Sequence, residues 1–108
     1  MSKWTQVCAL DNIYPATGVC ALIEGKQLAI FRPHDNEQVF AMDNMDPFAR
    51  ANVLSRGIIC EHQEQLWVAS PLKKQRFNLV NGSCLENQDV SVVTYKTRIK
   101  EGKIEVQV

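Results

Sequence analysis

The sequence predicts an all-β protein, an antiparallel β-sandwich or small barrel with one short helix. Short apolar segments rich in β-branched and aromatic residues recur along the chain, and turn residues separate them about every 8–12 residues. The last segment, residues 103–108, alternates between polar and apolar side chains, which is typical of a strand with one buried face. We therefore expect antiparallel strands rather than a parallel sheet with long connecting helices.

The length and composition predict one domain over residues 1–108. The 108 residues are 45% hydrophobic and 22% charged, which is an ordinary globular composition. A chain of this size can bury enough surface to fold without a disulfide or a metal as a staple. No internal repeat, low-complexity tract or linker suggests a boundary.

Strands are predicted for most of the first half of the chain. Residues 11–18 between the first two are rich in turn formers, and Gly25-Lys26 is expected to connect a hairpin. The predicted strands are 4–10, 18–24, 27–32 and 38–43.

A helix of two or three turns is predicted between Pro47 and Ser55. The Asp46 carboxylate can cap free backbone N–H groups, and proline suits the first helical position. Gly57 then closes the segment.

The second half of the chain is again strand-rich, and one of its turns is the expected functional loop. Strands are predicted at 57–62, 65–70, around 77–79, 90–96 and 103–108, with an Asn81-Gly82 turn. A turn with mostly polar residues, Ser70-Pro71-Leu72-Lys73-Lys74-Gln75, lies between two of them. A turn held by rigid strands is a common place for a binding or cofactor group.

Composition excludes several classes of partner. The formal net charge is zero, so neither nucleic acid nor an anionic membrane is expected to bind. The N-terminus lacks a cationic segment followed by an apolar run, and no segment approaches the roughly 18 apolar residues of a membrane span. We expect a cytoplasmic protein.

The four widely spaced cysteines include no C-x-x-C pair, and those in strand contexts, such as Cys8 and Cys20, are expected to be reduced and buried.

The sequence carries no motif for catalysis by this chain alone. It has no nucleophile elbow, no phosphate-binding glycine loop and only two histidines. Cys60-Glu61-His62 has the C-x-H spacing of half a Rieske iron–sulfur site, but no C-x-x-H follows it. A zinc site from these residues with Cys84 and His34 would match no usual spacing. No metal is expected.

Several segments together resemble one family over nearly the whole chain. They are Trp4, 18–22, 29–33, 38–41, 46–48, 53–57 and 66–77, and the most specific is Leu66-Trp67-Val68-Ala69-Ser70-Pro71-Leu72-Lys73-Lys74-Gln75-Arg76-Phe77. The sequence resembles the small subunits of bacterial NADH-dependent, sirohaem-type nitrite reductases. That resemblance implies a Rieske-type fold that lacks the ligands of a [2Fe–2S] cluster.

The resemblance places the missing ligands on two loops. Asp46 and Phe48 stand at the C-x-H positions of a cluster-bearing domain, and Ser70 and Lys73 stand at the cysteine and histidine of its second tip. These four side chains supply neither thiolate nor imidazole, so the resemblance implies that this chain holds no cofactor. Phe48 is expected to fill the space of the cluster rather than to anchor a partner.

The resemblance also implies a role and a partner. The expected role is support of a large subunit that reduces nitrite to ammonium with electrons from NADH and carries FAD, [4Fe–4S] and sirohaem. Lys73, Lys74 and Arg76 are candidate contacts to that subunit, against the alternative of a solvated rim. A Rieske-type electron carrier and an interaction module with another partner are the alternative functions.

Overall fold

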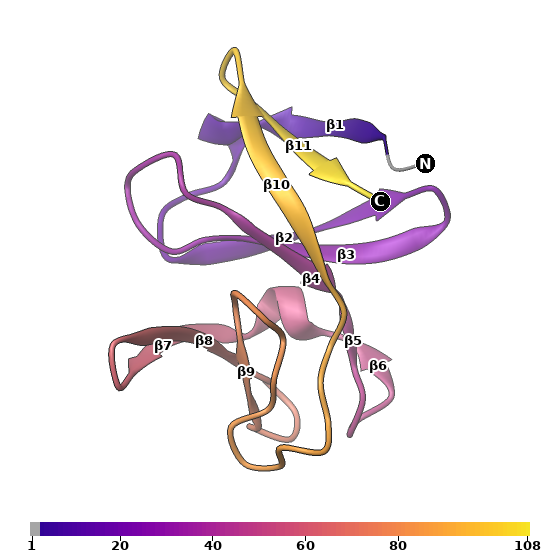
Figure 1. The fold of residues 1–108 in the computed structure, drawn as a ribbon, viewed down its shortest axis with the longest axis vertical. Helices are drawn as coiled ribbons and strands as arrows, with labels where there is room; N and C mark the ends of the chain where they lie inside the picture. The colour runs from indigo at the N-terminus through magenta and orange to yellow at the C-terminus, as the bar shows by residue number, and fades with distance from the viewer. Residues whose placement is uncertain (1–2) are drawn as a thin grey trace.

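The computed structural model describes residues 3–108 as antiparallel strands in three sheets (Figure 1). The six-stranded sheet has the order β1-β11-β10-β4-β3-β2, the three-stranded sheet the order β7-β8-β9, and β5 pairs with β6. The all-β prediction is confirmed. No helix among the described residues is long and apolar enough to cross a membrane. The strands are β1 Trp4–Ala9, β2 Thr17–Ile23, β3 Lys26–Arg32, β4 Phe40–Asp43, β5 Met45–Asp46, β6 Ala51–Asn52, β7 Ile58–His62, β8 Gln65–Ala69, β9 Arg76–Asn78, β10 Thr94–Lys100 and β11 Lys103–Gln107.

The predicted hairpin forms between β2 and β3, with its turn one residue earlier than expected. Glu24 and Gly25 both have positive φ, at 50° and 81°, and they form the two-residue turn between Ile23 and Lys26. Two consecutive left-handed residues match the right-handed twist of the flanking strands. The turn residues therefore set the pairing register of the whole hairpin.

Strand β3 is buried on both faces because it separates two apolar cores. Its even-numbered residues Leu28 and Ile30 face the first core, inside the curled six-stranded sheet, and Ala29 and Phe31 face the second, beneath β7-β8-β9. The first core contains Leu10, Ile13, Ile23, Leu28, Ile30, Val39, Ala41, Ile104 and Val106, and the second contains Ala29, Phe31, Met42, Leu54, Val68, Phe77, Leu79, Cys84 and Val92. One strand thus joins both halves of the molecule (Figure 1).

The helix predicted for Pro47–Ser55 is wrong. Residues 47–50 form a turn, Arg50 has a φ of 55°, and the chain returns as β6. The only helical element of this region is a three-residue 3₁₀ helix at Leu54–Arg56 (η2). The left-handed residue ends the turn because an α-helix cannot continue through that conformation.

The strand predicted for 90–96 begins four residues late, at Thr94. The preceding valines form an ordered loop that covers the second core: Cys84 N–H donates to Val90 O (3.1 Å) and Val92 N–H to Gly82 O (2.9 Å). Val92 is buried there. The β-branched residues therefore pack as predicted for an apolar segment, but without ladder pairing.

The cysteines are free, as expected, but they are not all buried. Cys84 is buried in the second core, whereas Cys20 is exposed on the edge strand β2, and that part of the prediction is wrong. Cys20 lies on the same strand face as Leu22, which is also exposed. Partial burial raises the pKa of the Cys8 thiol.

Asn44 ties the end of β4 to the second half of the molecule. Its side chain is buried and donates from Nδ2 to Asn52 O (3.0 Å), while Oδ1 accepts from Ser55 N–H (2.7 Å). Its backbone O accepts from Leu54 N–H at 3.1 Å. Both ends of the side-chain amide are thus used to hold β6 and η2 against the six-stranded sheet.

Replacing Asn44 with alanine is expected to lower the free energy of unfolding by about 3 kcal/mol, because buried partners lose their hydrogen bonds and a small cavity forms. Urea unfolding followed by circular dichroism measures this loss. Asn12→Ala, at an exposed position, serves as the matched control and should change stability by less than about 0.5 kcal/mol. Equal losses in both variants would contradict the role given to Asn44.

Tyr95 connects β10 to β4 through a hydrogen bond to a carboxylate. Its hydroxyl donates to Asp43 Oδ1 at 2.6 Å. Burial, followed by the hydrogen bond and negative charge of Asp43, raises the pKa of Tyr95 to about 12. Deprotonation would break the bond and bring two negative charges together.

The stability from this bond should be complete below the unfolded tyrosine pKa of about 10 and be lost as pH rises toward 12, because the folded pKa is the higher one. Urea unfolding across that pH range is the measurement. Tyr95→Phe should remove this part of the pH dependence. If the free energy of unfolding of Tyr95→Phe fell by the same amount over this pH range, the pH dependence would come from groups other than Tyr95.

Candidate functional site

The first loop of the candidate site, residues 47–50, folds around Asp46. This carboxylate is fully buried, and Oδ1 accepts from Phe48 N–H at 2.8 Å and Ala49 N–H at 3.2 Å. The backbone O of Asp46 accepts from Arg50 N–H at 2.7 Å. The predicted capping function of Asp46 is therefore present, although it caps a turn and not a helix.

The second loop, residues 70–75, folds around Ser70 in the same manner. Ser70 is buried; its N–H donates to Gln75 O (2.9 Å), and its backbone O accepts from Lys74 N–H (3.0 Å). Its Oγ also accepts from Leu72 N–H at 3.3 Å. Lys74 adopts a left-handed φ of 65°, which closes the loop.

One side-chain hydrogen bond joins the two loops. Ser70 Oγ donates to Asp46 Oδ2, and we call this pair the Asp46–Ser70 clasp. A buried carboxylate is costly unless hydrogen bonds replace its hydration. Here one hydroxyl and two backbone N–H groups do so. We use the term loop end for residues 46–50 and 70–75 together.

Phe48 lies between the loop end and the second core. Its half-buried ring packs against Phe77, with the ring centroids 6.2 Å apart and the planes tilted by 40°. This separation suits a favourable aromatic pair. Phe48 thus contributes to packing beneath the loops.

The basic residues of the second loop differ in their availability. Lys73 and Lys74 are exposed. Arg76 is half-buried, and its Nε contacts Glu86 Oε2 at 2.7 Å while its backbone N–H donates to Oε1 at 2.8 Å. Partial burial alone would raise the pKa of Glu86, but its hydrogen bonds and ion pair with Arg76 outweigh this and lower it. Glu86 therefore already neutralises Arg76.

The donors of the loop end do not fit an iron–sulfur cluster. It offers a carboxylate, a hydroxyl, a phenyl ring and an ammonium at Asp46, Ser70, Phe48 and Lys73, whereas the irons require thiolates and imidazoles. Cys60 and His62 lie on β7 instead. Within residues 3–108, no three His, Cys, Asp or Glu side chains are grouped to hold a metal ion.

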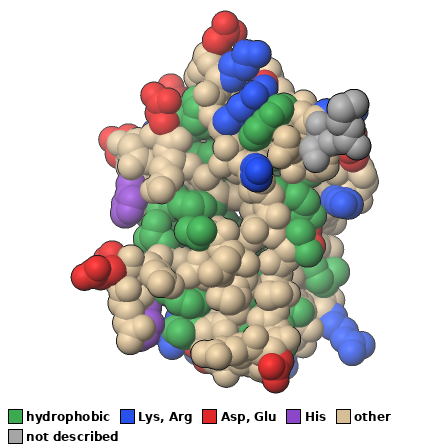
Figure 2. Space-filling view, in the orientation of Figure 1, with side chains coloured by type: hydrophobic (Ala, Val, Ile, Leu, Met, Phe, Trp, Pro, Cys, Tyr) green, Lys and Arg blue, Asp and Glu red, His purple; other side chains and the backbone are tan. Residues whose placement is uncertain are grey.

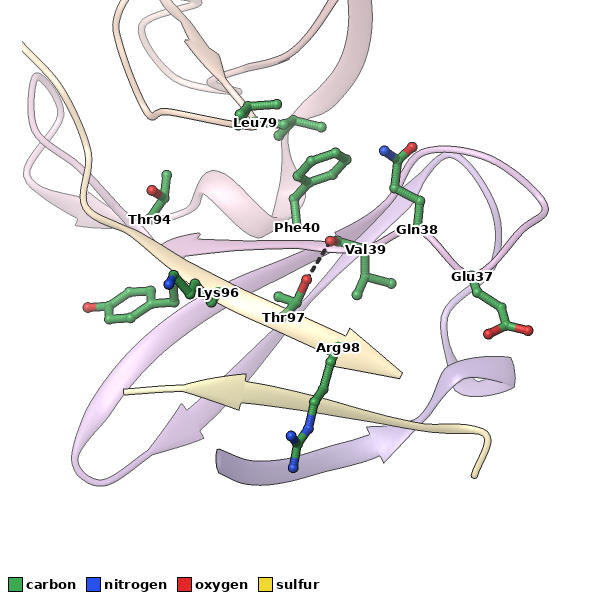
Figure 3. A pocket seen from close by; sticks show the side chains of 11 residues that line it. Glu37, Gln38, Val39, Phe40, Leu79, Thr94, Lys96, Thr97 and Arg98 are labelled. Carbon is green, nitrogen blue, oxygen red and sulfur yellow. Dashed lines mark hydrogen bonds between the residues drawn. The ribbon is translucent and has the colours of Figure 1, made fainter. Parts of the chain in front are cut away.

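A groove of about 590 Å³ lies between β10 and the start of β4 (Figure 3). The β4–β10 ladder ends at Tyr95↔Ala41, and beyond it Thr97 Oγ1 donates to Val39 O at 2.8 Å. Phe40 and Leu79 face one another across the groove, and the Arg98 side chain points away from it. The lining carries no acid–base pair suited to catalysis.

Comparison with known proteins identifies the family. Residues 3–107 match the model of the Rieske-like [2Fe-2S] domain family. The sequence is 56% identical over 107 residues to the small subunit of nitrite reductase (NADH) from Salmonella typhimurium, and the match covers 99% of both chains. The chain belongs to the nitrite reductase small-subunit family. The predicted resemblance is confirmed.

Solved structures agree with this small-subunit assignment. The NMR structure of Escherichia coli NirD has 54% sequence identity and a TM-score of 0.93, covering 100% of this chain and 98% of that chain. The ferredoxin of carbazole 1,9a-dioxygenase from Nocardioides aromaticivorans has 25% identity and a TM-score of 0.82, covering 96% of each chain. The Rieske-type fold is thus confirmed.

A further relative is a large subunit. The nitrite reductase [NAD(P)H] large subunit of Klebsiella oxytoca is 37% identical to this small subunit over 101 residues, which are 94% of this chain and 10% of that protein. A small-subunit domain therefore also exists within a chain named as a large subunit.

The sequence-based list of site residues omitted Arg50 and Glu86. Arg50 shares the loop end with Lys73 and Lys74, and the charge content of the turn after Asp46 could have indicated it. Glu86 lies ten positions from Arg76 and is brought to it by the chain reversal at Asn81-Gly82, where Phe77 pairs with Cys84. The predicted turn was a signal for this reversal, but it does not single out Glu86.

Ser70→Ala removes the hydroxyl of the clasp and leaves an oxygen of the buried Asp46 carboxylate without a partner. The free energy of unfolding should fall by about 1–3 kcal/mol. Asp46→Asn should cost less, because an amide can accept from the loop N–H groups and donate to Ser70 Oγ. Urea unfolding tests both, with the exposed Ser91→Ala as control. A Ser70→Ala variant as stable as the control would refute the clasp.

Proposed function

We propose that this chain, folded as one Rieske-like domain over residues 1–108, is the supporting small subunit of an NADH-dependent nitrite reductase and binds its large subunit. The observation that carries the proposal is 56% identity over 99% of the chain to a protein named as that subunit. The Klebsiella large subunit that contains a similar domain supports the partner. Domains that occur within one chain in one protein commonly associate when they are separate chains.

The chemistry of the loop end favours support over electron transfer by this chain. Reduction of nitrite to ammonium with electrons from NADH requires redox cofactors, and the side chains of Asp46, Phe48, Ser70 and Lys73 cannot ligate the irons of a [2Fe–2S] cluster. We assign FAD, [4Fe–4S] and sirohaem to the large subunit. The complex is proposed to work in the cytoplasm, in nitrogen assimilation or nitrite detoxification.

Reconstitution tests the supporting role. Large subunit purified from the same organism, with and without this chain, is compared for thermal inactivation and for nitrite-dependent NADH oxidation. The complex should retain activity longer or turn over faster, because a partner that binds the folded state stabilises it. A large subunit that performs equally well alone would make the supporting role wrong.

Iron analysis separates the supporting subunit from a Rieske-type electron carrier. The chain purified after expression with an iron–sulfur assembly system should contain no stoichiometric iron and show no visible absorption band. Stoichiometric iron with a visible band would favour the carrier. This readout is independent of nitrite reductase activity.

A further inference from the structure

The charges of this chain are unevenly distributed, although they sum to zero. Segments 46–58 and 69–76 together hold five of the twelve basic residues and one of the twelve acidic residues. The acidic one, Asp46, is fully buried and hydrogen-bonded. These segments therefore present positive charge to solvent. The five basic residues are Arg50, Arg56, Lys73, Lys74 and Arg76.

The fold brings the turn of residues 46–50 and the loop of residues 70–75 to the end of the molecule away from the β10–β11 turn, and η2 with Arg56 lies nearer the middle (Figure 1). The Asp46–Ser70 clasp holds the Arg50 turn against the loop of Lys73 and Lys74. The backbone next to Arg56 approaches the start of the second loop, because a Cβ at the neighbouring Gly57 would lie 2.4 Å from Ala69 O. In the same orientation as Figure 1, Figure 2 shows basic atoms at the lower right of the molecule, on the side where Figure 1 places β6.

Four of the five cations remain free to act on a partner. Arg76 is neutralised by Glu86. The salt bridges found within residues 3–108 involve none of Arg50, Arg56, Lys73 or Lys74. All four are exposed. Clustered cations attract an acidic surface and raise the rate of association with it.

Exposed apolar side chains lie among these cations. Leu72, at the tip of the second loop, is 57% exposed, and Ile58, which pairs with Ala69, is 73% exposed. Protein interfaces commonly combine an apolar anchor with a charged rim. The loop end with Arg56 and Ile58 has this composition.

We propose that this surface is the docking site for an acidic patch on the large subunit, with Leu72 entering an apolar pocket at its centre. The inference rests on the proposed function and adds the surface and the chemistry of its partner. The clasp makes Asp46 and Ser70 positioning residues, because it fixes the loops before binding and so reduces the ordering cost of association. Neither residue needs to touch the partner.

Binding of the purified large subunit to the immobilised chain, measured by biolayer interferometry, tests the surface. Lys73→Glu with Lys74→Glu should weaken binding by about tenfold or more at roughly 0.1 M salt, mainly through slower association. Lys100→Glu with Lys103→Glu makes the same charge change on the β10–β11 turn and should bind within about twofold of the unmodified chain. Raising the salt should weaken binding of the unmodified chain more than that of the Lys73/Lys74 variant.

Two leucine substitutions, one at the proposed anchor and one control, test the apolar contact. Leu72→Ala should weaken binding by about tenfold, whereas Leu22→Ala, which removes a leucine that is 71% exposed on β2, should not. Circular dichroism melting of each variant checks that the fold is kept. If the unmodified chain binds the large subunit and the Lys73/Lys74 and Leu72 variants bind it equally well, the proposed docking surface is wrong. No binding by the unmodified chain would instead overturn the proposed function.

Discussion

The buried carboxylate of Asp46 is the constraint on which the candidate site depends. It has no cation among its hydrogen-bond partners, and its oxygens accept instead from two N–H groups of its own loop and the Ser70 hydroxyl of the other. Each donor fixes a piece of backbone. The placement of Phe48, Arg50 and Leu72 therefore follows from satisfying the hydrogen bonds of this one buried pair.

Much of the fold could be predicted because its signals are local. Alternation and turn residues located most strands, and the Glu24-Gly25 turn differs from the prediction by one position. The signals at Asp46 were also local, but a cap followed by proline is common to helices and tight turns. The segment forms a turn in which Arg50 has a positive φ and Asp46 bonds to Ser70, which lies 24 positions away. The resemblance placed both residues in matching loops, and composition alone would not have paired them.

The fold is shared with proteins of different chemistry because its two halves are joined by parts outside the loop end. The double burial of β3 and the amide of Asn44 hold the sheets together. Neither lies on the two loops of the loop end, residues 46–50 and 70–75. Loop residues can therefore differ between proteins that share this scaffold, and fold and function separate at this site.

The pairing of β1 with β11 has a consequence for how this domain is made and used. Trp4 lies opposite Gln107, so strands from the two extremes of the chain are neighbours in the same sheet (Figure 1). During synthesis on the ribosome, β11 emerges only after nearly all of the chain, so β1 pairs with it late and the sheet is completed late. The same proximity means that a host chain can enter and leave the domain at one place. Such geometry suits insertion into a larger polypeptide, as the Klebsiella relative illustrates.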